Sequence, residues 1–327
     1  MRGIEVREFG PPDVLRMAEL PDPAPGPGQV VVAASASDVL FLDTMIRSGA
    51  AAGYFPIKPP YVPGNGVGGK VVAVGESVSQ AWLGRPVAAH TGGPGGTGGY
   101  AELAVADLEH VVAVPEDVDR FAATAVLHDG TTALRVLEIS DARPGEWVLV
   151  LGAAGGMGVL LVQLLAAQGA RVIGAARGST KREVAARAGA EATVDYGSPD
   201  WAAAVLEATG GARPQVVLDG VGGALGAAAF DLVADGGRFS AHGSPSGSFA
   251  RVGQDVARRR LVRMSTIGDL QYGPSDRARL MKDILARLAE GRITPHIGQT
   301  FPLAEAASAH AAIEARRTIA KTLLLTG

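Results

Sequence analysis

The stretch Trp147–Gly158 reads WVLVLGAAGGMG and is followed by the apolar run Val159–Ala167. Its first five residues form a short apolar run that ends at a glycine, which is typical of a strand buried on both faces of a parallel sheet. Gly152, Gly155 and Gly158 then form a G-x-x-G-x-x-G pattern in front of a helix-forming run. A turn without Cβ atoms lets the main chain approach a pyrophosphate, and the helix amino terminus directs its N–H groups at the anion. This context favours a dinucleotide site over a tight turn without a ligand.

Composition and charge exclude several classes of protein. The chain has 327 residues, of which 47% are hydrophobic, and its mean hydropathy is +0.19. We therefore expect a globular protein of about two domains. The net charge of −3 and the pI near 6.1 give no basic surface for nucleic acid or an anionic membrane. The amino terminus MRGIEVREFG lacks the apolar core of a signal peptide, and no apolar run is long enough to span a membrane. We expect a cytoplasmic protein that binds neither nucleic acid nor a membrane.

The first third of the chain has the pattern of a β-rich domain. Short β-prone runs are separated by Gly- and Pro-rich segments, and a short helix or turn is expected at Asp38–Gly49. The loop His90–Gly99 is rich in glycine, so it is either a mobile lid over a site or a solvated hairpin tip. The expected strands are Gly3–Phe9, Val14–Leu20, Gln29–Ala34, Gly69–Val74, Pro86–His90, Tyr100–Val105 and Val111–Val114.

From Arg120 onward, longer helical stretches and then alternating strands and helices predict a doubly wound parallel sheet. We place a cofactor domain at residues 121–268 and a second domain at residues 1–120 and 269–327. The expected strands of the cofactor domain are Trp147–Leu151, Ala170–Ala175, Ala192–Tyr196, Gln215–Gly220, Gly237–His242 and Arg263–Gly268. Its expected helices are Phe121–Leu127, Thr131–Ile139, Met157–Gln168, Thr180–Ala188, Asp200–Ala208, Ala224–Leu232 and Asp255–Leu261. The tail carries two expected helices, Asp276–Glu290 and Ala304–Ala315, and a closing strand, Lys321–Leu325.

The turn after the second strand of the cofactor domain indicates which dinucleotide binds. In an NAD site a carboxylate about 20 residues beyond the glycines accepts a hydrogen bond from the adenosine ribose. Here that position is Arg177, and Ser179, Lys181 and Arg182 follow it. A cationic cluster with a hydroxyl suits a 2′-phosphate, so the sequence favours NADPH over NADH. The alternative is an ordinary solvated helix start.

Several short segments along the chain together form a specific pattern: Phe41–Gly49, Pro63-Gly64, Val74-Gly75, Gly99–Glu102, Gly130–Ala133, Pro144–Glu146, Gly152–Gly158, Gly189-Ala190, Asp195-Tyr196, Val221–Gly223 and Gly236–Arg238. Through these segments nearly the whole chain resembles zinc-free members of the medium-chain dehydrogenase/reductase superfamily, and within it the quinone oxidoreductase group. The resemblance implies a GroES-like catalytic domain interrupted by a Rossmann-like cofactor domain. It also suggests a homodimer in which Arg263–Gly268 pairs at a sheet edge.

The resemblance implies roles for individual residues. Gly155, Gly156 and Met157 would face the pyrophosphate, and Arg177, Lys181 and Tyr196 would surround the 2′-phosphate and adenine. Tyr196 has a structural role as an alternative. Thr132 matches a threonine near the nicotinamide, although it could instead cap a helix. Val221, His242, Gly243 and Ser244 follow later strands at their carboxyl ends, where such sheets bind ligands. His242 could instead be a core histidine.

The chain departs from the family in the residues expected near the substrate and in the residues that bind zinc in the zinc-dependent relatives. Leu40 and Met45 stand where many quinone reductases have Asn and Tyr, and Asn65-Gly66 stands where many have Glu after Pro-Gly. The chain has no cysteine, and its six histidines show no ligand spacing. We therefore expect no metal and an altered substrate pocket.

The simplest chemistry without zinc is hydride transfer from NADPH to a conjugated acceptor, either a quinone or an α,β-unsaturated carbonyl. The following proton would come from solvent or from a nearby group, with Tyr54, Asp43, Thr132 and His128 as candidates. His128-Asp129 also fits a structural helix start. Two alternatives are an enoyl-thioester reductase of the same fold and an NADPH-binding protein with little turnover.

Overall fold

The computed structural model describes residues 1–92, 98–271 and 273–327. The chain divides into two compact units: unit 1 comprises Met1–Thr131 and Gly273–Gly327, and unit 2 comprises Thr132–Tyr272. The sequence placed the first boundary at 120/121 and the second at 268/269. The helix α2 (Arg120–Ser140) begins at the first of these positions and runs through the unit boundary at 131/132, so it contributes residues to both units. The expected lid or hairpin tip includes residues 93–97, which lie outside the described residues.

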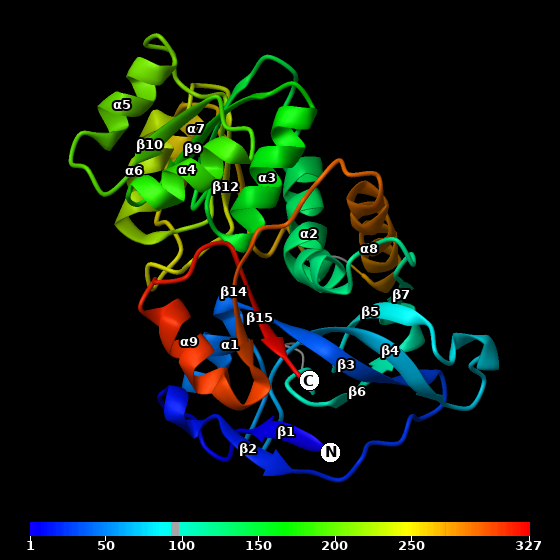
Figure 1. Ribbon diagram of the computed structural model, residues 1–327. Coiled ribbons are helices and arrows are strands. Elements are labelled where there is room, and N and C mark those ends of the chain that lie inside the picture. Colours follow the sequence, from blue (N-terminus) through cyan, green and yellow to red (C-terminus); the bar gives the residue numbers. More distant parts are fainter. Residues whose placement is uncertain (93–97, 272) are drawn as a thin grey trace. The chain divides into compact units, whose positions relative to one another are not determined.

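Unit 2 is built on a six-stranded parallel sheet with the strand order β10-β9-β8-β11-β12-β13. This order reverses between β8 and β11, so the prediction of a doubly wound sheet is confirmed. Figure 1 shows the helices that connect these strands. The strands are β8 (Trp147–Leu151), β9 (Arg171–Ala176), β10 (Ala192–Asp195), β11 (Val216–Asp219), β12 (Arg238–Ala241) and β13 (Arg263–Thr266). The helices are α3 (Gly156–Ala167), α4 (Ser179–Arg187), α5 (Trp201–Ala208), α6 (Gly223–Leu232) and α7 (Gln254–Arg259).

The core of unit 2 follows from its apolar strands. All five residues of β8 are buried, as are all four residues of β11 beside it. On one face of the sheet, Leu149 and Val217 belong to the same core cluster as Phe230 and Phe239, whose rings meet edge to face at 5.5 Å between centroids. A strand covered by helices on both faces must be apolar at every position, which is why these runs do not alternate.

Unit 1 contains a GroES-like sheet of seven strands. Six of them follow the order β14-β15-β3-β4-β5-β7, and the seventh, β6, pairs with β3. A small antiparallel pair, β1 with β2, completes its strands among the described residues. The strands are β1 (Arg2–Glu5), β2 (Arg16–Glu19), β3 (Gln29–Val39), β4 (Gly66–Val74), β5 (Pro86–His90), β6 (Leu103–Asp107), β7 (Val111–Ala113), β14 (Ile297–Pro302) and β15 (Lys321–Leu325). The helices are α1 (Phe41–Ser48), α8 (Pro274–Ala289) and α9 (Ala306–Glu314), with short 3-10 turns at Pro12–Val14, Gln80–Trp82, Leu108–His110 and Leu303–Glu305.

One expectation about elements was wrong, and one strand was missed. The predicted break between the helices Phe121–Leu127 and Thr131–Ile139 does not exist, because α2 is continuous. Gly130, inside α2, faces α8: a Cβ there would lie 2.4 Å from Cγ1 of Ile284. The glycine therefore allows close helix packing and does not end the helix. The strand β14 was missed because Gly298 and Pro302 interrupt its sequence.

A buried polar chain fixes the start of α1 in unit 1. Asp43 is 3% exposed, and its Oδ2 accepts hydrogen bonds from the Leu40 N–H at 2.8 Å and from the Tyr100 hydroxyl at 3.1 Å. The Tyr100 oxygen also lies 3.1 Å from Nε2 of His310. Burial, with added repulsion from Asp38, raises the pKa of Asp43 to about 7. Burial lowers the pKa of His310 to about 3, so this ring is neutral.

We predict that Asp43→Asn changes how stability depends on pH. A carboxyl group whose pKa is raised in the folded state binds its proton more tightly there than in the unfolded chain, so it stabilises at low pH. That stability is lost as pH rises from about 4 to about 7, at roughly 1.4 kcal/mol per pH unit. Asparagine offers the same acceptor to Leu40 and carries no charge. The variant should therefore gain stability relative to wild type between pH 5 and pH 8, measured by urea unfolding.

Asp13→Asn is the matched control, because Asp13 is an exposed carboxylate of the same unit. Its stability difference from wild type should stay the same at both pH values. An Asp43→Asn difference that is also independent of pH would contradict the raised pKa.

Candidate functional site

The glycine turn after β8 is shaped by contacts that exclude side chains. Gly152 has φ +75°, and its carbonyl accepts the Gly155 N–H at 2.8 Å. A Cβ on Gly158 would lie 2.1 Å from the same carbonyl oxygen, so α3 begins directly against the turn only because this position is glycine. Gly155 is exposed, and Gly156 and Met157 are half-buried. The N–H groups of the first helical turn, which have no partner within a helix, form a suitable anion site here.

The turn after β9 brings Arg177 and Tyr196 together. The Arg177 guanidinium carbon lies 5.9 Å from the centre of the Tyr196 ring, which follows β10. Two parallel neighbouring strands end here, so residues far apart in sequence meet at one sheet edge. Ser179, which is exposed, and Lys181, which is half-buried, lie in the first turn of α4 directly after Arg177. This edge therefore gathers basic groups, a hydroxyl and an aromatic face.

Sequence reasoning missed Asp195 at this turn. Its Oδ2 accepts the Gly178 N–H at 3.0 Å, and its Oδ1 accepts the Gly197 N–H at 2.7 Å. The turn thus receives a carboxylate from the neighbouring strand, although none exists in its own sequence. Both carboxylate oxygens bind main-chain groups, so Asp195 shapes the turns that carry Arg177 and Tyr196. The adjacent Asp195-Tyr196 in the family pattern was the signal that could have identified it.

The loops after β11 and β12 contain four further expected cofactor residues of unit 2. Val221 and Ser244 are half-buried, and the Ser246 N–H donates to the Val221 carbonyl at 3.0 Å. Gly243 is packed against Gly220: a Cβ would lie 2.2 Å from its carbonyl carbon. His242 is 6% exposed with Nδ1 3.1 Å from the Ser240 hydroxyl. Burial lowers the pKa of His242 to about 4, so its ring is neutral, which favours the structural alternative.

Thr132 is half-buried in α2, and its neighbour Thr131 is buried. The Thr131 hydroxyl donates within the helix toward the carbonyls of Leu127 and His128, both at 3.0 Å. Thr132 lies inside the helix and therefore does not cap its start. Its expected place near the nicotinamide stays a prediction.

A second group that sequence reasoning missed is a buried ion-pair cluster in unit 1. Lys321 Nζ lies 3.2 Å from Oδ2 of Asp38 and 3.1 Å from Oδ2 of Asp129. Burial by itself would lower the pKa of Lys321, but Asp129 and Asp38 raise it above its usual value. The partners are separated by nearly the whole chain, so no local sequence signal reveals this cluster.

His128 and His90 lie in the same unit with their rings edge to face, 5.6 Å between centroids. Burial lowers the pKa of both rings, most strongly that of His90, so both are neutral. The His128 ring can therefore form hydrogen bonds, but it carries no positive charge at neutral pH.

The structure explains one departure from the family pattern. A Cβ on Gly66 would lie 2.5 Å from Oδ1 of Asp38 and 2.9 Å from the Leu127 side chain. The Asp38 carboxylate thus occupies the space in which a glutamate at position 66 would begin. Leu40, at the N-cap of α1, is buried, and Met45 in α1 is half-buried. The early segment is therefore less polar at these two positions than in the family pattern.

The other catalytic candidates differ strongly in their surroundings. Asp43 is enclosed by Leu40 and Tyr100, as described above. Tyr54 is 81% exposed. The two candidates are thus a buried carboxyl and an exposed hydroxyl.

A zinc-type donor set is not found among the described residues. The chain has no cysteine, and no group of three His, Asp or Glu side chains among the described residues could hold a metal ion. No helix in the described part of the chain is both long and apolar enough to cross a membrane.

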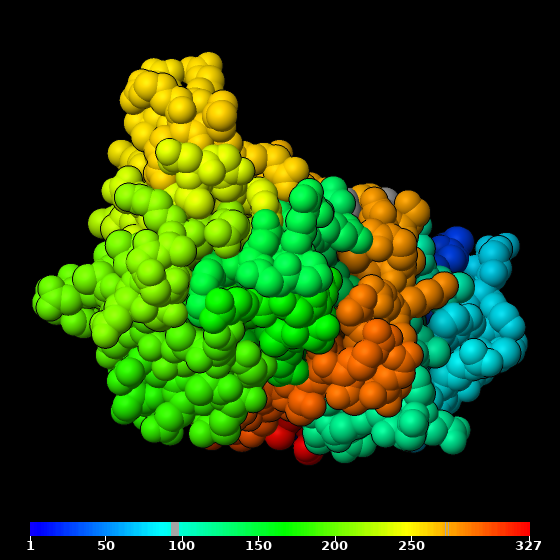
Figure 2. All heavy atoms as spheres, turned by 90° about the horizontal axis from the view of Figure 1, so that it is seen from above, coloured from blue at the N-terminus to red at the C-terminus, as the bar shows by residue number. Residues whose placement is uncertain are grey.

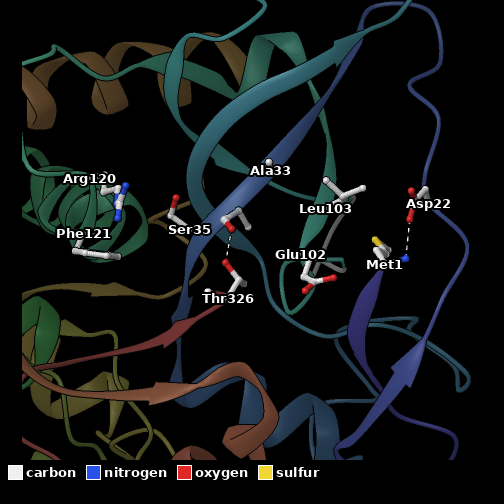
Figure 3. A pocket seen from close by; sticks show the side chains of 11 residues that line it. Met1, Asp22, Ala33, Ser35, Glu102, Leu103, Arg120, Phe121 and Thr326 are labelled. Atoms are coloured by element: carbon white, nitrogen blue, oxygen red, sulfur yellow. Dashed lines mark hydrogen bonds and ion pairs between the residues drawn. The ribbon is translucent and has the colours of Figure 1, made fainter.

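A surface hollow of about 640 Å³ lies on unit 1, and none of the predicted site residues lines it. Figure 3 shows that polar groups in it already have partners: the Met1 amino group pairs with Asp22 at 2.6 Å, and the Thr326 hydroxyl donates to the Ala34 carbonyl. We assign no ligand to this hollow.

Comparison with known proteins agrees with the fold. The alcohol dehydrogenase GroES-like domain family model matches residues 26–116, and the zinc-binding dehydrogenase family model matches residues 188–324. A quinone oxidoreductase of Pseudomonas aeruginosa is 33% identical over 326 residues, covering 98% of both chains. A 2-haloacrylate reductase of a Burkholderia species is 32% identical over 328 residues, covering 98% of this chain and 97% of that protein.

Solved structures agree with this result. Escherichia coli quinone oxidoreductase, complexed with NADPH, matches with a TM-score of 0.92 at 26% identity, covering 100% of both chains. A mycobacterial protein, also complexed with NADPH, matches with a TM-score of 0.91 at 32% identity over 100% of both chains. The chain belongs to the medium-chain dehydrogenase/reductase superfamily and, within it, to the quinone oxidoreductase group.

Proposed function

We propose that this oxidoreductase is a zinc-independent, NADPH-dependent reductase that transfers a hydride to a quinone or an α,β-unsaturated carbonyl. The observation that carries the proposal is Arg177 beside Tyr196 at the edge of the sheet that also bears the glycine turn. Relatives named for quinone and for 2-haloacrylate both support a conjugated acceptor. A haloacrylate, like an enone, has a carbon–carbon double bond conjugated with a carbonyl group.

The proposed cofactor site has two parts that bind phosphate. The main-chain N–H groups of Gly156 and Met157 bind the pyrophosphate, since the helix dipole favours an anion there. Gly155, whose own N–H bonds the Gly152 carbonyl, faces the pyrophosphate without a side chain. Arg177, Ser179 and Lys181 bind the 2′-phosphate, with the adenine against Tyr196. When bound, NADPH supplies the hydride, while the protein provides position and polarity.

The proton that follows hydride transfer does not require a dedicated acidic side chain. Asp43 is fixed by two hydrogen bonds at the start of α1, which favours a structural role for it. Tyr54 is open to solvent, and His128 is neutral with a lowered pKa. We therefore propose that the proton comes from solvent or from a hydroxyl such as Thr132 or Tyr54.

We also propose that zinc is not required, because the donors that hold it in dehydrogenases are missing. Zinc in such enzymes is bound by Cys, His and acidic ligands. This chain has no Cys, and the buried Asp38 and the half-buried Asp129 both pair with the buried Lys321. The carboxylates therefore have an internal cation as partner.

A homodimer is part of the proposal. The strand β13 is an edge strand of the unit 2 sheet, so its main-chain groups are available to a second copy. Its surroundings expose Leu261 at 78% and Ile267 at 37%. Figure 2 shows this region in gold, projecting from the green part of the same unit. An exposed apolar edge of this kind suits pairing between two copies.

The test of the proposed activity is NADPH oxidation by the purified protein with a simple quinone, a simple enone and an enoyl thioester, after treatment with a chelator. We expect turnover with the quinone or the enone, and we expect it to survive the chelator. Turnover only with an enoyl thioester would favour that alternative substrate. Saturable NADPH binding without turnover on any of the three acceptors would favour a binding protein. Activity that is lost with the chelator and restored by zinc would contradict the metal-free mechanism.

We predict that Arg177→Ala combined with Lys181→Ala weakens NADPH binding by about 10- to 100-fold, because charge-assisted hydrogen bonds to the 2′-phosphate are removed. NADH lacks that phosphate, so its affinity should change by less than about twofold. Isothermal titration of both nucleotides provides the measurement. The matched control is Arg187→Ala, since Arg187 is an exposed cation at the other end of α4. Equal losses for NADPH and NADH would contradict the assignment of the 2′-phosphate site.

A further inference from the structure

The two loops at the carboxyl ends of β11 and β12 are both attached to Asp219, the last residue of β11. Its Oδ1 accepts the N–H groups of Val221 at 2.9 Å and of Gly222 at 2.8 Å. Its main-chain carbonyl accepts the N–H groups of His242 at 3.1 Å and of Gly243 at 3.0 Å. One residue therefore holds the first loop by its side chain and the second by its main chain.

The two loops are also bonded to each other. The Ser246 N–H donates to the Val221 carbonyl at 3.0 Å, and the Gly223 N–H donates to the Ser248 carbonyl at 2.9 Å. Contacts between them leave no room for side chains, since a Cβ on Gly222 would lie 2.2 Å from the Ser248 carbonyl oxygen. Moving the first loop must therefore also displace the second.

Asp219 is held in a tight and water-poor place. Its side chain is 0% exposed, and a Cβ on Gly226 would lie 2.1 Å from its Oδ2. This Oδ2 has no hydrogen-bond partner among the described residues, and burial raises the pKa of the carboxyl group. Burying a carboxyl group with one unpartnered oxygen is costly. The cost indicates that the loop geometry fixed by Oδ1 is needed.

The position of these loops in the sheet indicates their purpose. The strand order reverses between β8 and β11, and a dinucleotide lies across such a reversal at the carboxyl ends of the strands. Arg177 and Tyr196 follow β9 and β10, on one side of the reversal, so the adenosine half belongs there. The loops attached to Asp219 follow β11 and β12, on the other side, where the nicotinamide half must lie.

We propose that Asp219 is a positioning residue that fixes both nicotinamide-side loops, and thereby the nicotinamide half of NADPH, without contacting the adenosine half. This inference rests on the proposed NADPH function. We therefore expect that loss of the Asp219 acceptor weakens the binding of NADPH and leaves the binding of its adenosine 2′-phosphate end unaffected.

The test compares NADPH with adenosine 2′,5′-bisphosphate, which carries the adenine and the 2′-phosphate but no nicotinamide. Asp219→Ala should weaken NADPH binding about tenfold or more and change bisphosphate binding by less than about twofold. Asp219→Asn should restore NADPH binding to within about threefold of wild type, because the amide oxygen can accept the same two N–H groups. Asp231→Ala, an exposed position in the same unit, is the matched control and should change neither affinity.

The possible failures are distinguishable. If the wild type binds neither compound, the proposed NADPH function fails. If Asp219→Ala weakens both compounds equally, weakens neither, or is not rescued by Asp219→Asn, the positioning role is overturned while the function stands.

Hydrogen–deuterium exchange of the wild type keeps the inference testable if Asp219→Ala does not fold. NADPH should slow exchange in peptides spanning residues 219–226 and 242–248, and the bisphosphate should not. Equal protection of these peptides by both compounds would overturn the inference.

Discussion

The contact between α3 and the end of β8 is the constraint on which the rest of the proposed site depends. A Cβ on Gly158 would lie 2.1 Å from the Gly152 carbonyl oxygen, so the helix can begin this close to the strand only without a side chain. This close approach aims the unpaired N–H groups of the first turn of α3 along the carboxyl edge of the sheet. All parallel strands end at that edge, so the adjoining turns supply the other groups for the same ligand.

Two carboxylates at this edge accept hydrogen bonds from main-chain N–H groups. Asp195, at the end of β10, binds the N–H groups of Gly178 and Gly197, and Asp219, at the end of β11, binds those of Val221 and Gly222. Each aspartate thereby shapes the loops beside it. The edge can then present N–H groups and the Arg177 cation to a polyanion such as NADPH.

Sequence patterns predicted the regular elements well where local signals were strong. The strands Trp147–Leu151, Pro86–His90 and Lys321–Leu325 have the predicted bounds, because each is a short apolar run between turn residues. Gly130 misled the prediction because its cause is tertiary, namely the Ile284 side chain packed against it. The Lys321 cluster was not predictable for the same reason: Asp38 and Asp129 meet it only after the sheet has formed. The cluster of Arg177, Ser179 and Lys181 was predictable because these residues lie close together in the sequence. The hydrogen bonds from Gly178 and Gly197 to Asp195 were not predicted, because Asp195 comes from the next strand.

We propose that the carboxyl edge of the unit 2 sheet recognises the 2′-phosphate of NADPH. The most direct measurement is the pair of dissociation constants of the unmodified protein for NADPH and NADH, under the same buffer and salt conditions. We expect NADPH to bind at least about tenfold more tightly, because charge-assisted hydrogen bonds form to one additional phosphate. Equal affinities, or a preference for NADH, would contradict it.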